Sequence, residues 1–242
     1  MNTDIDKLKE ILRDSENIVF FGGAGVSTES GIPDFRSADG LYNEKYEYAP
    51  ETILSYSFFM DHTQEFYRFY RDKMLYPNAK PNDAHKALAE LEKRGKLKAV
   101  ITQNVDGLHT EAGSINVLEL HGSALRNLCM TCKKNYPVEV ILQIEEIPRC
   151  TCGGVIKPDV VLYEEGLDPV IMSKATTAIY DADVLIVGGT SLNVYPAAGM
   201  INYYRGDKLV LINKSETPYD KYANLIIRES IGHTLRLAIT DL

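Results

Sequence analysis

Short apolar runs alternate with segments of helical periodicity along this chain, and that alternation limits the possible fold more than any other feature. The runs number six and lie at Ile18–Phe21, Ala99–Thr102, Val117–Leu120, Val184–Val187, Leu209–Ile212 and Leu225–Ile227. Strands that are apolar throughout are typical of parallel sheets whose two faces are both covered. Between the runs, segments such as Ala84–Arg94 have helical spacing, with Asn82 or Asp83 as a cap and Gly95 as the stop. We therefore predict an α/β fold built on a doubly wound parallel sheet.

Two segments interrupt the alternation. Residues 38–80 are rich in Tyr and Phe and contain a helical stretch around Gln64–Met74, and residues 126–157 contain every cysteine of the chain. A chain of 242 residues suits one large core with a smaller excursion. We expect a large domain and a small lobe, with the active cleft between them. The predicted large domain comprises residues 1–37, 81–125 and 158–242, and the predicted small domain combines a helical module, 38–80, with a cysteine-bearing ribbon, 126–157.

The four cysteines form two close pairs, Cys129-x-x-Cys132 and Cys150-x-Cys152, and the second pair is followed by two glycines. This spacing is close to that of a four-thiolate zinc ribbon, and free thiols are the alternative. The second pair has one intervening residue instead of two, and we expect an extended strand there to point both thiols the same way. Four thiolates leave the metal no open position, so we predict one structural zinc ion.

Charge and hydropathy exclude several classes of partner. The formal charge of −8 leaves no broad basic surface for a nucleic-acid backbone, so basic peptides are better candidate partners. The N-terminus is a charged amphipathic segment without an apolar signal core, and no later stretch is long and apolar enough for a bilayer. We expect a cytoplasmic monomer that binds neither nucleic acid nor membrane.

A glycine-rich loop, Gly23-Ala24-Gly25, follows the first predicted strand and is expected to open a helix that holds a pyrophosphate. Thr28 stands where a third glycine is usual, and a tight turn without a ligand is an equal alternative for the loop alone. The loop continues into a segment that Pro33 stiffens and that presents Phe35 and Arg36 beside the phosphates. That arrangement favours a dinucleotide held for cleavage over one held for hydride transfer.

Polar side chains follow the second and third predicted strands, where strand ends meet the ligand crevice. Residues 103–106, Gln-Asn-Val-Asp, offer amide and carboxylate groups for a carboxamide and ribose hydroxyls, although an isolated Asn-x-Asp is more often a turn. His121 follows the third strand and is the candidate base, since an imidazole titrates near neutral pH. For His85 and His109 we expect structural hydrogen bonds. His62 and His233, the remaining histidines, are expected at the surface or at helix caps.

Together these motifs resemble those of the sirtuin family, NAD-dependent protein-lysine deacylases of the bacterial type. The matching stretches are GAGVSTESGIPDFRS, TQNVDGLH, the LHG histidine, the four cysteines, GTSLNVYPAAG and LINKSET, which span nearly the whole chain. The resemblance implies a Rossmann-like large domain and a small lobe made of a zinc ribbon and a helical module. It also implies that NAD is consumed: the acyl-lysine oxygen captures the ribose, giving nicotinamide, O-acetyl-ADP-ribose and free lysine.

The resemblance also implies roles for individual residues. His121 is expected to be the catalytic base, and Asn104 a second catalytic residue. The implied NAD contacts are Gly23, Ala24, Gly25, Thr28, Phe35, Arg36, Gln103, Asn104, Val105, Asp106, His121, Gly189, Thr190, Ser191, Asn213 and Ile231. An acetylated peptide is expected to add as a strand between two segments, with contacts from Val160, Leu162, Tyr163, Glu164, Asn193 and Val194.

Three departures from the family pattern affect these expectations. Gly22 stands where many members have threonine, which we expect to alter packing. Glu164 replaces a common glycine, and its charge is expected to favour basic substrates. Members that remove acidic acyl groups pair a tyrosine with an arginine three residues on, whereas here Tyr67 is followed at that spacing by Tyr70, although Arg68 and Arg71 are near.

We therefore predict deacetylation over desuccinylation. Removal of other acyl groups and mono-ADP-ribosyl transfer, which uses the same NAD site, are the alternatives. A hydride-transferring dehydrogenase is a rival supported by the glycine loop alone. A non-enzymatic zinc-ribbon binding module is a second rival, which the negative charge of the chain disfavours.

Overall fold

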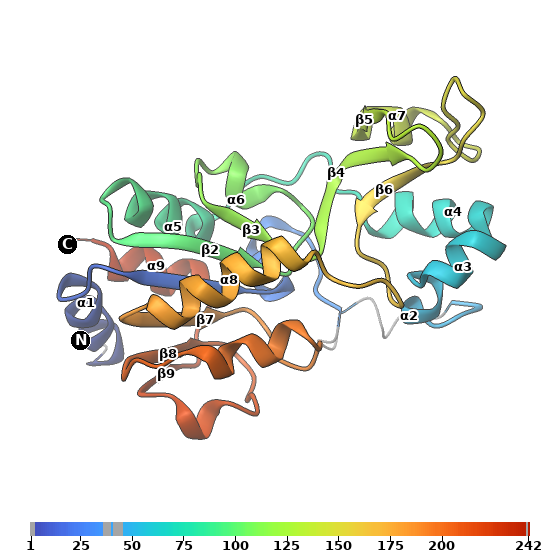
Figure 1. The fold of residues 1–242 in the computed structure, drawn as a ribbon. Helices are drawn as coiled ribbons and strands as arrows, with labels where there is room; N and C mark the ends of the chain where they lie inside the picture. Colours follow the sequence, from blue (N-terminus) through green and yellow to red (C-terminus); the bar gives the residue numbers. More distant parts are fainter. Residues whose placement is uncertain (1–2, 36–39, 41–45, 241) are drawn as a thin grey trace.

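The computed structural model describes residues 3–35, 40, 46–240 and 242 and contains a six-stranded sheet at its centre (Figure 1). In spatial order its strands are β3 (Val117–Glu119), β2 (Leu97–Thr102), β1 (Ile18–Gly22), β7 (Val184–Gly188), β8 (Leu209–Ile212) and β9 (Leu225–Ile227). Every neighbouring pair is parallel. The six predicted runs are therefore confirmed as strands of one doubly wound sheet, and the direction of winding reverses between β1 and β7.

A smaller unit lies beyond one end of this sheet (Figure 1). It contains an antiparallel sheet in the order β5 (Asn135–Pro137), β4 (Gly122–Cys129) and β6 (Ile156–Val160). Its helices are α2 (Pro50–Ile53), α3 (Tyr56–Asp61), α4 (Thr63–Lys73) and α7 (Val138–Gln143). Phe66 and Tyr70 of α4 share one buried cluster with Ala124, Cys129 and Ile156 of the small sheet, so the two predicted insertions do pack together. The predicted domain boundaries themselves stay a prediction.

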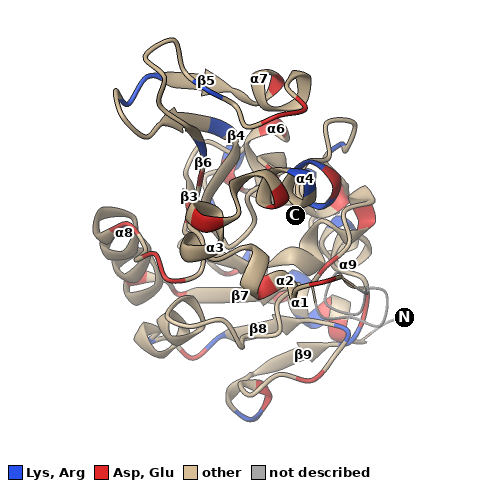
Figure 2. Cartoon of the chain, turned by 90° about the vertical axis from the view of Figure 1, so that its right-hand side faces the viewer, with Lys and Arg blue, Asp and Glu red and all other residues tan. Residues whose placement is uncertain are grey.

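Charged residues of both signs are interspersed along the elements that face the viewer in Figure 2. The view shows no continuous basic strip across the two units, in keeping with the formal charge of −8. Within the described part of the chain, no helix combines the length and the apolar character that crossing a bilayer requires.

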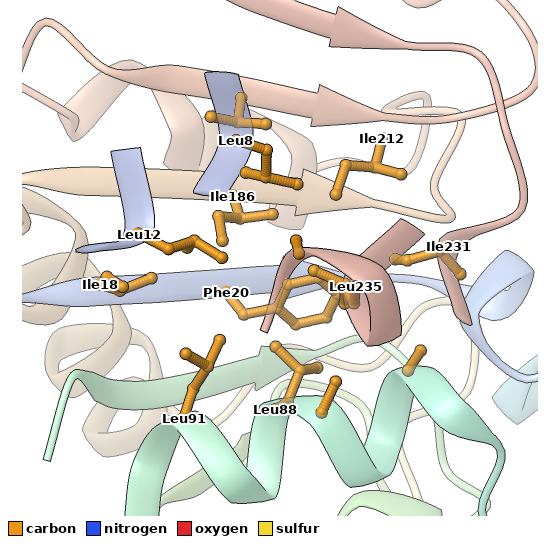
Figure 3. Close-up of a cluster of buried hydrophobic side chains, with 14 of the residues drawn as sticks. Leu8, Leu12, Ile18, Phe20, Leu88, Leu91, Ile186, Ile212, Ile231 and Leu235 are labelled. Atoms are coloured by element: carbon orange, nitrogen blue, oxygen red, sulfur yellow. The ribbon is translucent and has the colours of Figure 1, made fainter. Parts of the chain in front are cut away.

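Helices cover both faces of the large sheet. On one face lie α1 (Thr3–Arg13), α5 (Asp83–Lys93) and α9 (Ile231–Ala238), whose apolar side chains surround Phe20 (Figure 3). On the other lie α8 (Pro169–Asp181) and the 3₁₀ helix η4 (Ala197–Tyr203). Successive residues of β1 enter opposite cores and are all fully buried. This double burial is why the strands are apolar throughout. Two further short elements of the large unit are α6 (Leu108–Glu111) and η5 (Asp220–Tyr222).

The beginning of α5 shows which of the two predicted caps is used. The Asn82 side chain accepts a hydrogen bond from Ala84 N at 2.9 Å, and Asn82 N donates to His85 Nδ1 at 3.2 Å. The structural hydrogen bond predicted for His85 is therefore confirmed. Gly95, with a φ of 75°, ends the helix as expected.

The hydrogen-bonding role predicted for His109 is wrong. Neither ring nitrogen has a hydrogen-bond partner among the described residues, and the ring is 2% exposed. It packs instead against the rings of His85 and Phe20 at centroid distances of 4.7 and 6.1 Å. Burial lowers the pKa of His109 to about 3, so the ring is neutral and serves as an apolar filler.

Leu88 tests the contribution of the helix-covered core. Its side chain is fully buried between α5 and the sheet, so we expect Leu88→Ala to lower the free energy of unfolding by about 2–5 kcal/mol. Ile115, which is 91% exposed, is the matched control, and Ile115→Ala should change stability by less than about 0.5 kcal/mol. Urea unfolding followed by circular dichroism measures both. Equal losses in the two variants would contradict this assignment of the core.

Candidate active site

The candidate site lies where β1, β2 and β7 end, at the reversal of the sheet's winding. The glycine loop follows β1, residues 103–106 follow β2, and Gly189 and Thr190 follow β7. His121 lies between β3 and β4. The carboxyl ends of parallel strands share one edge of a sheet, so segments far apart in the sequence meet here.

The glycine loop does not open the α-helix that its pattern predicts. It forms two 3₁₀ turns, η1 (Ala24–Val26) and η2 (Thr28–Ser30). Two features explain why the loop forms 3₁₀ turns instead of an α-helix. The Val26 carbonyl accepts a hydrogen bond from Asn82 Nδ2 at 2.8 Å, and Gly31 ends the second turn with a φ of 83°. The loop therefore offers no long helix dipole to a phosphate.

The glycines of this loop allow two strand ends to approach. Gly25 N donates to Gly189 O at 2.8 Å, and a Cβ added to Gly25 would lie 2.8 Å from Gly189 Cα. Gly23 N likewise donates to Gly188 O at 3.3 Å. These N–H groups already have protein acceptors, so their predicted use by a pyrophosphate stays a prediction. Gly22 was expected to affect packing, and the structure agrees, because a Cβ at this position would lie 2.6 Å from the Phe20 ring.

Ser27 joins the loop to the residues after β2. Its hydroxyl donates to Asp106 Oδ2 at 2.6 Å and accepts from Asn104 Nδ2 at 3.0 Å. Ser27 is 1% exposed, so this polar network is largely withdrawn from water. Ser27 is a site residue that none of the sequence motifs indicated. Its small polar side chain two residues after Gly25 was the available signal, but its partners lie 77 and 79 positions away.

Gln103 connects the remaining strand ends. Its side chain donates to Thr190 Oγ1 at 3.2 Å, and its backbone N donates to Gly22 O at 3.0 Å. Its carbonyl lies 2.9 Å from His121 Nδ1. The structure therefore brings Gln103, Asn104, Asp106, Thr190 and His121 into one connected group.

The contact with Gln103 determines the protonation pattern of His121. A carbonyl oxygen only accepts, so Nδ1 carries the hydrogen and Nε2 of the neutral ring carries the lone pair. Burial lowers the pKa of His121 from its ordinary value of 6.5, and the hydrogen bond to Gln103 opposes this in part. The imidazole is therefore neutral at pH 7, the form that a general base requires.

The other predicted NAD contacts are more dispersed. Phe35 and Val105 are half-buried and pack against the core of the small unit. Thr28 is exposed, Ala24 and Ser191 are half-buried, and Asn213 follows β8 with its side chain bonded to Ser215 O. Ile231 is 4% exposed at the start of α9. Arg36 lies outside the described residues. Direct NAD contact stays a prediction for all of these.

The predicted peptide segments are partly occupied by protein contacts. Val160 and Leu162 are buried, and Val161 N donates to His121 O at 3.0 Å. Leu162 N donates to the Glu165 side chain, and the backbone of Tyr163 pairs with Leu54 and Tyr56.

Tyr163, Glu164 and Asn193 have exposed side chains, and Val194 is half-buried. A peptide strand would therefore have to use backbone groups other than the N–H groups of residues 161–163.

The four cysteines form a compact cluster. All four sulfur atoms lie within 4.8 Å of one another, and the Cys129–Cys152 and Cys132–Cys150 sulfurs are each 3.5 Å apart. Zinc–sulfur bonds of about 2.3 Å in a tetrahedron place sulfurs about 3.8 Å apart, so this arrangement fits one zinc ion. Gly154 is required beside it, because a Cβ there would lie 2.8 Å from Cys129 Sγ. The donor set is consistent with a structural zinc site.

The extended strand expected at Cys150-x-Cys152 is wrong. Gly153 N donates to Cys150 O at 2.8 Å, which closes a tight turn, and Gly153 has a φ of 85°. The turn directs both thiols to the cluster in place of strand alternation. The backbone N–H of Cys152 and the Tyr136 hydroxyl lower the pKa of Cys150 to about 5. A thiolate, the form that binds metal, is thereby favoured.

Comparison with known proteins gives consistent matches over the whole chain. The model of the Sir2 family matches residues 23–196. The chain is 62% identical over 239 residues to a protein of Clostridium perfringens named NAD-dependent protein deacetylase, covering 97% of this chain and 98% of that protein. A protein of Clostridium acetobutylicum with the same name is 59% identical over 239 residues, again covering 97% and 98%.

Solved structures agree with these sequence matches. A structure described as "Structural Basis for the Mechanism and Regulation of Sir2 Enzymes" superposes with a TM-score of 0.89 at 40% identity, covering 99% of this chain and 97% of that one. A complex of Sir2 with a p53 peptide and NAD⁺ superposes with a TM-score of 0.85 at 40% identity, covering 96% and 95%. A third, with a deacetylated p53 peptide and 3′-O-acetyl-ADP-ribose, has a TM-score of 0.89 at 40% identity and covers 97% and 96%.

Metal analysis tests the cysteine cluster. We expect about one zinc per chain by atomic emission, and Cys132→Ser should reduce that content and lower Tm by more than about 5 °C, because the metal ties together two turns. Thr151→Ala, which changes the residue between two ligands, should retain the zinc. Full zinc binding by Cys132→Ser would show that the cluster is not the metal site.

Proposed function

The chain belongs to the Sir2 family and is an NAD-dependent protein deacetylase, and from that premise we propose how its own residues carry out the reaction. The enzyme cleaves the nicotinamide–ribose bond of NAD and transfers the acetyl group of acetyl-lysine to ADP-ribose. Its residues must hold the dinucleotide, exclude water and remove a proton from a ribose hydroxyl.

His121 is the proposed general base, and the hydrogen bond between its Nδ1 and Gln103 O is the observation that carries this proposal. The bond leaves the lone pair on Nε2 and fixes the orientation of the ring. Val161 N, which donates to His121 O, holds the backbone of the same residue. His121 is thus held once at its ring and once at its backbone before any substrate binds, which lowers the entropic cost of reaching a reactive geometry.

Ser27, Asn104 and Asp106 are proposed to hold the ribose and carboxamide of NAD. Their mutual hydrogen bonds fix the directions of one hydroxyl, one amide and one carboxylate in a largely buried setting. Asn104 and Asp106 each retain acceptor capacity beyond these bonds. Because the group is already ordered, substrate hydroxyls replace water rather than reorganise the site.

Phe35 is proposed to shield the reacting ribose from water. An amide oxygen is a poor nucleophile, so water would compete for the ribose carbon unless it is kept out. Phe35 is half-buried against the core of the small unit and lies shortly after the glycine loop. Its position therefore supports a role between the two units.

The interior of the small unit supports acetyl over succinyl groups. Tyr67 and Tyr70 are fully buried, and the Tyr67 hydroxyl donates to Ile156 O. Arg71 is already bound to backbone carbonyls, with Nε 2.9 Å from Ile141 O and Nη1 2.9 Å from Glu145 O. Neither tyrosine is therefore accessible, and the Arg71 guanidinium is already hydrogen-bonded to the backbone. A succinyl carboxylate would lack the paired donors that it needs.

Acetylated peptides are the substrate class, and we propose that the enzyme acts on them as a cytoplasmic monomer. A reduced four-thiolate metal site is typical of a reducing compartment, which supports that location. Strand addition reads mainly backbone, so the proposal includes broad peptide specificity.

The role of His121 is tested through the products and their pH dependence. We expect wild-type enzyme to release one nicotinamide per O-acetyl-ADP-ribose formed, and His121→Ala to lose about 10²- to 10⁴-fold in rate. Because burial lowers the pKa of His121, activity should be retained near pH 6.5 and fall only below it, as the base becomes protonated. Mass spectrometry of NAD products and kcat/KM profiles measure both. Undiminished turnover by His121→Ala would exclude this base.

Acyl selectivity is tested with matched peptides that carry acetyl- or succinyl-lysine. A missing hydrogen bond to a charged group costs about 1.5–3 kcal/mol, so kcat/KM for the acetyl peptide should exceed that for the succinyl peptide by about 10- to 150-fold. Arg68→Ala serves as a control, because this exposed arginine should not affect the ratio. Equal kcat/KM values for the two peptides would refute the preference.

A further inference from the structure

Glu164 has an uncommon backbone conformation in the segment that follows β6. Its φ is 76°, in the left-handed region that favours glycine, and its side chain is exposed. A residue other than glycine, Asn or Asp in this conformation requires compensating contacts. The surroundings of its carboxylate provide them.

The carboxylate of Glu164 binds the first turn of α3. Oε2 accepts from Ser57 N at 2.9 Å, and Oε1 accepts from Ser57 Oγ at 2.9 Å. The preceding residue is joined to the same element, because Tyr163 N donates to Leu54 O and Tyr56 N donates to Tyr163 O, both at 3.0 Å. Side chain and backbone thus attach one segment, residues 163–164, to the helical module.

Glu165 is held by a different element. Its Oε2 accepts from Lys157 Nζ of β6 at 2.8 Å and from Leu162 N at 2.8 Å. The carboxylates of two successive residues therefore contact different elements: Glu164 contacts α3, and Glu165 contacts β6. Of these two residues, Glu164 has the left-handed backbone conformation. The segment is fixed to both parts of the small unit at once.

The partners of Glu164 are neutral. Within the described ranges its carboxylate forms no ion pair, and its two donors are an amide and a hydroxyl. A glutamine could retain the same geometry, with its oxygen accepting from Ser57 N and its amide donating to Ser57 Oγ. The contact thus depends on shape and hydrogen bonding more than on charge.

We propose that Glu164 is a positioning residue for the peptide substrate: its bonds to Ser57 hold the segment after β6 against α3, so that this wall of the peptide site is ordered before binding. The inference rests on the proposed peptide site between residues 160–165 and 191–195. A pre-ordered wall lowers the entropic cost of strand addition. Loss of the bonds should weaken peptide binding and leave the chemical step unchanged.

Four variants separate the contributions. Glu164→Gly removes the carboxylate and also the backbone strain of the left-handed conformation. Glu164→Ala removes the carboxylate but keeps that strain. Glu164→Gln retains the hydrogen-bond geometry without charge, and Ser57→Ala removes one donor. We expect peptide KM to rise roughly fivefold or more in Glu164→Gly and Glu164→Ala, less in Ser57→Ala, and by less than about twofold in Glu164→Gln. The kcat value and the KM for NAD should stay near those of the wild type.

Asp168→Asn is the matched control. Asp168 also places a carboxylate at a helix start, accepting from Val170 N at 2.7 Å, but its hydrogen bonds within the described residues cap only its own helix. The Asp168→Asn variant should therefore leave peptide KM unchanged. The Tm values of all variants show whether a change in KM reflects a loss of global stability.

Calorimetric titration of an acetyl-lysine peptide without NAD provides a readout that does not depend on turnover. Parallel increases in Kd and KM for Glu164→Gly support the proposal, even if deacetylation itself were too slow to measure. Unchanged peptide affinity in Glu164→Gly would overturn it. The proposal would also be overturned if Glu164→Gln and Glu164→Gly lost equal peptide affinity, and only for peptides with flanking Lys or Arg. The carboxylate would then act by attracting the charge of the substrate. Failure of the wild type to release nicotinamide would count against the proposed function alone.

Discussion

Burial of the central strands on both faces is the constraint on which the rest of the structure depends. β1 and β7 lie at the reversal of the winding, and every residue of both strands is buried. At such a reversal the connections leave neighbouring strands toward opposite faces of the sheet, which is where open α/β sheets place their ligand sites. Gly25 and Gly189 bring the loops after these two strands into direct backbone contact. The polar residues of the site are then carried on loops whose positions the buried strands determine.

The sequence predicted the features that follow from local chemistry. Strands covered on two faces must be apolar throughout, so all six were found from their composition, and four clustered cysteines in a chain without others indicated a metal site. Two of the errors, those at the glycine loop and at His109, concern contacts distant in sequence. The Asn82 side chain donates to the Val26 carbonyl from 56 positions away, and His109 packs against the Phe20 ring. The residues adjacent to Val26 and His109 in the sequence do not indicate these partners.

The arrangement of the site shows how neutral groups can prepare it for chemistry. A backbone carbonyl determines which nitrogen of His121 carries hydrogen, and burial keeps the ring unprotonated. Ser27, hydrogen-bonded at once to an amide and a carboxylate, joins the loop after β1 to the residues after β2. The residue types of this site could be predicted from strand endings, but their connections could not, since each connection depends on how two loops approach one another.

Strand β4 begins directly after His121 and ends at Cys129, so a single segment joins the proposed base to the cysteine cluster. It pairs with β5 on one edge and β6 on the other, and a register irregularity between Ser123 and Asn127 already interrupts its ladder with β6. Inserting or deleting one residue there would reverse the faces of all that follow and move a thiol away from its three partners. Evolutionary change in length should therefore be tolerated in the outer turns of the small unit and be almost absent from this segment.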